Sequence, residues 1–341
     1  MARLSRDDAK AAAKDHMETI AKEIIEPMTR GDLPEWVKPW RGLFMPYALS
    51  LRGPYTGRWN RLSLLRAQRL NDYETPVWGG FKDFLRLGQR YAKSIGSDDY
   101  FGIQKGQTKT GQTFRPFSRR WTRTETDAVT GETETKSYGY TDFYLGGVFN
   151  LAQTNIPAEW VSDLIGYTVE PIETDYYDAV HALITETLPG LTIEDGAVRE
   201  DRAYYQQVFD SVALPPLECF SSDEARAAVL LHEAAHATGH STRLSRDGIT
   251  GAHPFGSVSY ACEEIVAEVG AVIAAAVLGI SYDAPNHATY LAGWANRILA
   301  GGDIDSVAPF VGQAMDAAMW MLDGRPPTRE ELDAETAVTS R

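Results

Sequence analysis

The chain has 341 residues, of which 43% are hydrophobic and 23% are charged, and its formal net charge is −14. This composition is typical of a soluble globular protein, and the length suits two domains better than one hydrophobic core. The longest apolar run, around Val269–Ile280, is too short to span a bilayer, and the N-terminus has no apolar signal segment. We therefore expect no membrane partner and a cytoplasmic location.

Charge is distributed unevenly between the two halves. Residues 1–150 hold 24 Lys and Arg against 18 Asp and Glu, a net of +6. Residues 151–341 hold 9 against 29, a net of −20. This asymmetry indicates a basic module that meets nucleic acid and an acidic module with another task.

The first half is predicted to contain helices followed by a small antiparallel sheet. The helices are expected at 5–30, from an N-cap at Asn60 to Asn71, and at Gly80–Ser94. Residues Tyr100–Asn150 alternate aromatic and β-branched side chains with glycine turns, which favours strands. Within them, Thr122–Lys136 is expected to be an exposed hairpin tip or a mobile loop.

The second half is predicted to be mostly helical with a short sheet, so the fold class is α+β. Strands are expected at Leu191–Ile193, Ala203–Val208 and Ser211–Leu214. Helices are expected at Thr174–Leu188, from Ser221 or Ser222 to near Gly239, and at Ser257–Leu278, Asn286–Ala300 and Ser306–Leu322.

A metal-binding motif lies in the long helix that ends near Gly239. It reads His232-Glu233-Ala234-Ala235-His236. Positions four apart share a helix face, so the two imidazoles can bind one tetrahedral ion, for which zinc is favoured. The carboxylate of Glu233 can then take a proton from water on the metal. The structural alternative is a pair of core histidines capped by Glu233.

The third ligand is expected on the helix at Ser257–Leu278. Glu264 and Glu268 border its apolar stripe, and a buried carboxylate is costly unless it binds something. We assign Glu264 as the ligand and Glu268 as the group that orients a histidine, an arrangement that resembles the gluzincins. Glu263 is the rival ligand, and His240 ranks lower because its spacing is too short.

His253 and Tyr260 lie between the ligands in sequence and are candidate donors to a developing oxyanion. The alternative identities are a surface histidine and a core tyrosine. Both interpretations remain open from the sequence.

Cations and tryptophans are interleaved in the first half. Residues 30–123 hold 18 Lys and Arg against 7 Asp and Glu, a net of +11, and five of the eight tryptophans. Phosphates attract cations and unstacked bases stack on flat side chains, so the pattern favours single-stranded DNA. The alternative is core tryptophans beside a solvated basic face. The candidate DNA contacts are Lys38, Trp40, Arg58, Trp59, Asn60, Trp78, Lys105, Lys109, Arg115, Arg119, Arg120 and Trp121.

These residues resemble the ArdC-type antirestriction proteins of plasmids and phages. The C-terminal likeness covers about residues 203–280, through the segments Leu231–His240 and Glu263–Ala271. The N-terminal likeness rests on Trp36–Trp40, Tyr55–Arg58, Trp78, Lys105-Gly106 and Val148–Asn150. The chain departs from the family pattern at Trp59-Asn60-Arg61 and through Phe114–Trp121.

The resemblance implies a single-stranded-DNA-binding domain followed by a zincin-like metallopeptidase domain, which we place at 1–155 and 156–325. The polar segment 326–341 is expected to be a flexible tail. It implies DNA protection during conjugation or early infection, with a restriction component as a possible protein substrate. Zinc is the expected metal, and manganese can occupy the same ligands. The alternatives are a non-enzymatic single-stranded-DNA-binding protein with a structural metal, and a metallopeptidase without a DNA role.

Overall fold

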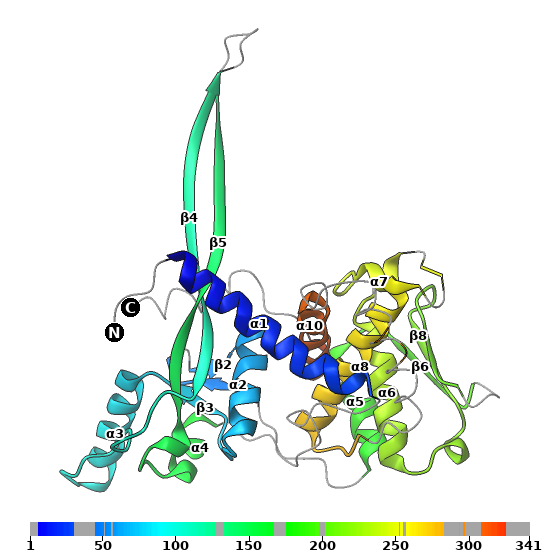
Figure 1. The fold of residues 1–341 in the computed structure, drawn as a ribbon. Coiled ribbons are helices and arrows are strands. Elements are labelled where there is room, and N and C mark those ends of the chain that lie inside the picture. The colour runs from blue at the N-terminus through cyan, green and yellow to red at the C-terminus, as the bar shows by residue number, and fades with distance from the viewer. Residues whose placement is uncertain are drawn as a thin grey trace.

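The computed structural model describes residues 6–30, 45–50, 52–55, 57–126, 133–166, 175–197, 202–251, 253–254, 257–282, 293, 296 and 308–324. Within these residues the chain is α+β, as the sequence predicted. In Figure 1 the first sheet and the helices of the second half lie side by side, and helix α1 (Arg6–Met28) runs across both.

The first sheet has five strands in the order β2-β1-β3-β5-β4. Their bounds are β1 (Tyr47–Ala48), β2 (Gly53–Pro54), β3 (Val77–Gly79), β4 (Gly111–Thr126) and β5 (Thr133–Asn150). Only the end of β5, at Phe149 and Asn150, pairs with β3. Strands β4 and β5 otherwise pair with each other, and their pairing continues to Thr126 and Thr133. Most of the segment that was expected to be a hairpin tip or loop is therefore a regular β-ribbon.

Two helices flank this sheet, α2 (Arg58–Leu70) and α3 (Phe81–Ile95). The predicted N-cap at Asn60 is wrong, because α2 begins two residues earlier after Gly57. The Asn60 side chain instead accepts a hydrogen bond from the backbone N–H of Phe114, 2.5 Å away, and so ties α2 to β4. Helix α3 ends at Gly96, whose φ of 64° suits a glycine C-cap.

The two halves share a hydrophobic core. Ile20, Ile24 and Met28 of α1 are fully buried in the cluster that also contains the helices of the second half. Conversely, α4 (Ala158–Ile165) packs on the first half, where Val161 joins a cluster with Phe84 and Phe149. The packing therefore ties α1 to the second half and α4 to the first, and the boundary expected at residue 155 stays a prediction.

The second half surrounds a central pair of helices, α6 (Asp223–Ala237) and α8 (Val258–Leu278). Its sheet has the order β6-β8-β7, formed by β6 (Thr192–Asp195), β7 (Tyr204–Gln206) and β8 (Ser211–Leu214). The remaining helices are α5 (Tyr176–Thr187), the short α7 (Asp247–Thr250) and α10 (Ala308–Asp323). The helix expected at Asn286–Ala300 lies outside the described residues except at positions 293 and 296.

Helix α8 is buried along nearly its whole length because α6 and α10 pack against it. Small residues make this close approach possible: at Gly270 of α8, an added Cβ would lie 3.1 Å from the carbonyl oxygen of Ala314 in α10. Among the described helices, none combines the length and the apolar character that crossing a membrane requires.

Candidate metal centre and basic groove

Helix α6 presents two histidines on one face. Its N-terminus is capped by Ser222, whose hydroxyl accepts a hydrogen bond from the N–H of Ala225. The alanine and leucine side chains of the helix then pack in the core. His232 and His236 follow one turn apart, and both are buried. The i, i+4 spacing places their rings side by side, with centroids 4.9 Å apart.

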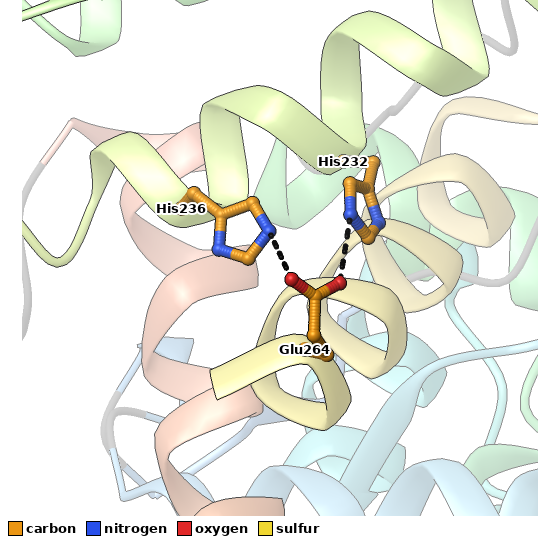
Figure 2. Close-up of side chains that lie close together, drawn as sticks. All are labelled: His232, His236 and Glu264. Atoms are coloured by element: carbon orange, nitrogen blue, oxygen red, sulfur yellow. Dashed lines mark ion pairs between the residues drawn. The ribbon is translucent and has the colours of Figure 1, made fainter. Parts of the chain in front are cut away.

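Glu264 of α8 faces both histidines, as Figure 2 shows. Its two carboxylate oxygens lie 3.7 Å from Nε2 of His232 and 3.8 Å from Nε2 of His236. Metal–ligand bonds of about 2.0–2.1 Å in a tetrahedral site would put two donor atoms roughly 3.4 Å apart. All three residues offer donor atoms within 4.8 Å of one another, so small shifts would let them share one ion.

The other nitrogen of each histidine is held by a carboxylate. Nδ1 of His232 lies 3.0 Å from Glu268, and Nδ1 of His236 lies 3.3 Å from Glu263. Such partners fix the orientation and tautomer of metal-binding imidazoles. Both Nε2 atoms are thereby left to face Glu264.

Glu263 makes its contacts away from the third-ligand position. Its carboxylate accepts hydrogen bonds from Arg246, from Nη2 at 2.6 Å and from Nε at 3.1 Å. Burial raises the pKa of Glu263, but Arg246 and His236 outweigh that effect and keep the pKa below its usual value. Glu263 therefore contacts His236 and Arg246, and of the two neighbouring carboxylates it is Glu264 that faces the Nε2 atoms of both histidines.

Arg246 has no counterpart in the sequence-based predictions. Besides Glu263, its guanidinium donates to the hydroxyl of Thr238 at 2.6 Å and to the carbonyl of Ala235 at 2.8 Å. It therefore joins the C-terminal end of α6 to α8. The available signal was a lone arginine shortly after the motif helix, which does not distinguish it from a surface cation.

The cluster carries an excess of negative charge. The carboxylates of Glu233, Glu263, Glu264 and Glu268 surround the two histidines, and Arg246 supplies one positive charge. Uncompensated buried charge is costly. The donor set, its geometry and this charge imbalance together fit a divalent metal ion.

The same imbalance acts on His236. Burial lowers its pKa, but the hydrogen bond to Glu263 and the negative charges of Glu264, Glu263 and Glu233 raise it to about 9. The same negative charges that favour a proton on this ring would favour a metal cation beside it.

Tyrosine hydroxyls complete the polar surroundings. Tyr260 lies one turn before Glu264 on α8, and its hydroxyl bonds the Glu264 carboxylate. Burial and the charges of Glu264 and Glu233 raise the pKa of this phenol far above its usual value, so it stays protonated. Tyr282, which the sequence reasoning missed, is buried and bonds Glu268 in the same way.

The two remaining histidine candidates make other contacts. Nε2 of His253 lies 2.9 Å from the carboxylate of Asp247 and 3.0 Å from its carbonyl oxygen. Nδ1 of His240 lies 2.8 Å from the hydroxyl of Thr242. His253 as an oxyanion donor therefore stays a prediction that none of its described contacts supports.

A groove of about 1510 Å³ opens on the first half, beside β4, α2 and α3. Its lining includes seven cations and one carboxylate, Asp83. The cations are Arg52, Arg58, Lys82, Arg86, Arg90, Lys109 and Arg115. The aromatic lining includes Phe81 and Phe143, which are 50% and 40% exposed and so present flat apolar surfaces to the groove.

The groove collects five of the predicted DNA contacts: Arg58, Trp59, Asn60, Lys109 and Arg115. The prediction that Trp78 contacts DNA is wrong. This side chain is fully buried in the core with Leu64 and Val148 and has no surface for a base to stack on. Lys105 is exposed outside the groove lining. Lys38 and Trp40 lie outside the described residues, and Arg119, Arg120 and Trp121 belong to strand β4, where the structure does not describe their side chains.

Sequence reasoning missed four groove cations. Three of them, Lys82, Arg86 and Arg90, stand four residues apart on α3. That spacing puts them on one helix face and was a usable signal. The fourth, Arg52, lies between β1 and β2.

Two glycines of β5 lie directly beneath cations that line the groove. An added Cβ at Gly146 would lie 2.1 Å from Nε of Arg115, and one at Gly147 would lie 2.7 Å from Cδ of Lys109. Both long side chains therefore lie flat across β5. Glycine is required here for close approach of side chains to backbone.

The groove borders the second half at the start of α2. Nη1 of Arg58 lies 3.1 Å from the carboxylate of Asp316 on α10. Arg58 crosses Gly312, where an added Cβ would lie 2.9 Å from its Cδ atom. The two modules are thus in direct side-chain contact.

Comparison with known proteins agrees with this two-part organisation. Residues 14–145 match the family model of the N-terminal domain of the anti-restriction factor ArdC, and residues 179–302 match that of a zincin-like metallopeptidase. Crystal structures of the antirestriction ArdC protein of plasmid R388, metal-free and Mn(II)-bound, each superpose with a TM-score of 0.54 at 25% identity. Each match covers 90% of this chain and 97% of the ArdC chain. The chain is an ArdC-type protein.

Curated relatives of this ArdC-type chain include two Escherichia coli proteins named DNA primase TraC. One is 29% identical over 323 residues and the other 30% identical over 299 residues, covering 87% and 85% of this chain. The chain spans 27% and 19% of the length of those two proteins. An uncharacterized protein of Sinorhizobium fredii, y4eC, is 26% identical over 328 residues, covering 93% of this chain and 95% of its own length.

Proposed function

We propose that this protein holds single-stranded DNA in the basic groove and carries a zinc peptidase centre in its second half, as an antirestriction protein of a plasmid or phage. The observation that carries the DNA part is the groove itself, with seven cations against one carboxylate beside exposed Phe81 and Phe143. Cations bind phosphates without regard to sequence, and aromatic rings stack on unpaired bases. Duplex DNA offers phosphates but no exposed base faces.

Fluorescence anisotropy of a labelled single-stranded oligonucleotide tests the DNA part with the full-length chain. If all seven groove cations neutralise phosphates, the logarithm of the affinity should fall with the logarithm of salt concentration with a slope of roughly −5. An unlabelled duplex should compete poorly. Absence of binding at low salt would leave a metallopeptidase without a DNA role.

The peptidase part rests on Glu233. It follows His232 on the helix that supplies both histidines, it is buried, and its charge acts on His236 and Tyr260. Zinc bound by His232, His236 and Glu264 would supply Lewis-acid activation of water and of a peptide carbonyl. Glu233 would accept the proton of that water and pass it to the leaving amine. The protonated hydroxyl of Tyr260 would donate a hydrogen bond at the reacting carbonyl.

Glu233→Gln separates this proposal from a purely structural metal. The substitution keeps the size of the side chain and removes its basicity, so zinc stoichiometry and unfolding temperature should stay near those of the original chain. A peptide library with mass-spectrometric readout should show metal-dependent cleavage that the variant lacks. Cleavage by neither protein, with one zinc bound to each, would establish the structural alternative. If cleavage is found, restriction components become the proposed substrates to examine.

A further inference from the structure

The β4–β5 ribbon extends far beyond the rest of the described chain, as Figure 1 shows. Its base is held by the body: Lys10 of α1 pairs with Asp142 at 2.9 Å, and Ser63 of α2 donates to the carbonyl of Gln112. Starting with Phe117↔Asp142, the pair that Lys10 anchors, ten residue pairs continue outward to Thr126↔Thr133. At about 3.4 Å per residue they span roughly 34 Å. We call these ten pairs the arm.

The register gives the two faces of the arm different compositions. Residues directly opposite in an antiparallel pair share a face, and faces alternate along each strand. One face, here the mixed face, has the pairs Phe117↔Asp142, Arg119↔Tyr140, Trp121↔Tyr138 and Arg123↔Lys136. The other face has Ser118↔Thr141, Arg120↔Gly139, Thr122↔Ser137 and Thr124↔Thr135.

On the other face, which we call the hydroxyl face, two hydroxyl groups bond each other within the ribbon. The hydroxyls of Thr124 and Thr135 lie 3.2 Å apart across the two strands. The mixed face, in contrast, concentrates three cationic and four aromatic positions over four successive pairs. Two-stranded ribbons are marginally stable on their own, so contact of this face with another molecule would stabilise the arm.

Both faces of the ribbon border the groove, which Pro116 and Phe143 line from the other face. The next pair of the mixed face toward the body is Arg115↔Tyr144; Arg115 lines the groove, and Tyr144 is 40% exposed. Positions 115, 119 and 123 therefore form one series of cations that leaves the groove and follows the arm. The series ends where Glu125 stands opposite Glu134, a pair of like charges that repels phosphate.

We propose that the mixed face of the arm is a second contact for single-stranded DNA, which leaves the groove past Arg115 and runs outward along the ribbon. This inference rests on the proposed DNA-binding function. The alternation of cations and aromatic residues matches phosphates and bases, whereas an acidic or apolar protein partner would match only one of them. The arm therefore lengthens the binding site without sequence readout.

Two oligonucleotides of different length test the arm in the full-length chain. One has roughly 8 nucleotides, within the site sizes known for single-strand grooves, and the other is about three times as long. The arm variant deletes Arg119–Tyr140 and joins Ser118 to Thr141 through Asn-Gly, a two-residue hairpin turn that preserves the register. The short strand should bind equally to both proteins, and the long strand should bind the arm variant at least about tenfold more weakly.

A matched pair of substitutions identifies the face. Arg119→Gln and Arg120→Gln remove the same charge from neighbouring positions on opposite faces. Arg119→Gln combined with Trp121→Ala should weaken binding of the long strand about tenfold or more, and Arg120→Gln should leave it within a factor of about two. The salt slope for the long strand should become shallower by roughly 2 in the arm variant, which loses three cations of the mixed face.

The outcomes separate the two proposals. If neither strand binds the original chain, the proposed DNA function fails. If both strands bind, but the arm variant binds them as the original chain does, the arm inference alone is wrong. The arm inference is also wrong if the deletion changes only the oligomeric state in light scattering, because the arm would then be a contact between copies of the chain.

Discussion

Replacing Arg246 by methionine should weaken metal binding as well as the fold. Methionine fills similar space but removes the two hydrogen bonds to Glu263, of 2.6 and 3.1 Å, and those to Thr238 and Ala235. Glu263 then stays buried beside His236 without its cation. Breaking one side of a buried ion pair costs about 3–5 kcal/mol of unfolding free energy.

The effect on metal follows from the position of Glu263. Without Arg246 its carboxylate is free to move, and Nδ1 of His236 loses a fixed partner. Losing the group that orients a metal-binding histidine weakens metal affinity by about 10- to 100-fold. Competition with a chromophoric chelator measures that affinity, and urea unfolding in excess chelator measures the stability of the metal-free chain.

Arg243 provides the matched control. It is buried to a similar extent and also donates to the end of α6, at the carbonyl of Ala237, but its ion-pair partner is Asp210. Arg243→Met should lower stability and leave metal affinity within a factor of about two. Equal losses of metal affinity in the two variants, or none in Arg246→Met, would refute the claim that Arg246 acts through Glu263 and His236.

Three further predictions test other parts of the structure. Gly146→Ala should displace the Arg115 side chain and lower single-stranded DNA affinity about as much as Arg115→Ala does, because the added Cβ would lie 2.1 Å from Nε; anisotropy with both variants checks this. Trp78→Ala should cost about 3–5 kcal/mol of unfolding free energy, and the fraction that remains folded should bind DNA with unchanged affinity. Burial raises the pKa of Asp210, but its bonds to Arg243 and Tyr205 outweigh burial and hold the pKa below 3.8. Its stabilising effect should thus be complete above that pH and be lost as the pH falls through the lower folded value; urea unfolding of Asp210→Asn should therefore differ from the original chain at pH 7 and converge with it in acid.

Local sequence was sufficient where the physics is local. The i, i+4 spacing of His232 and His236 puts both rings on one face of any helix, and Ser222 marks where that helix starts. The uneven charge of the two halves likewise predicted where the cations gather, since the groove that they line lies in the basic half. The four-residue spacing of Lys82, Arg86 and Arg90 is local in the same way and predicts one basic helix face.

Tertiary packing decided what periodicity leaves open. Glu263 and Glu264 are neighbours about 100° apart around α8, so only the rotation of α8 against α6 determines which one faces the histidines. Trp78 resembles the surface tryptophans in sequence, yet its strand lies inside the sheet. Arg246 and Tyr282 enter the metal centre through loops whose course depends on the whole core. Strand alternation sets the two faces of the β4–β5 ribbon, but its register, and with it the pairs that share each face, exists only once the strands have met.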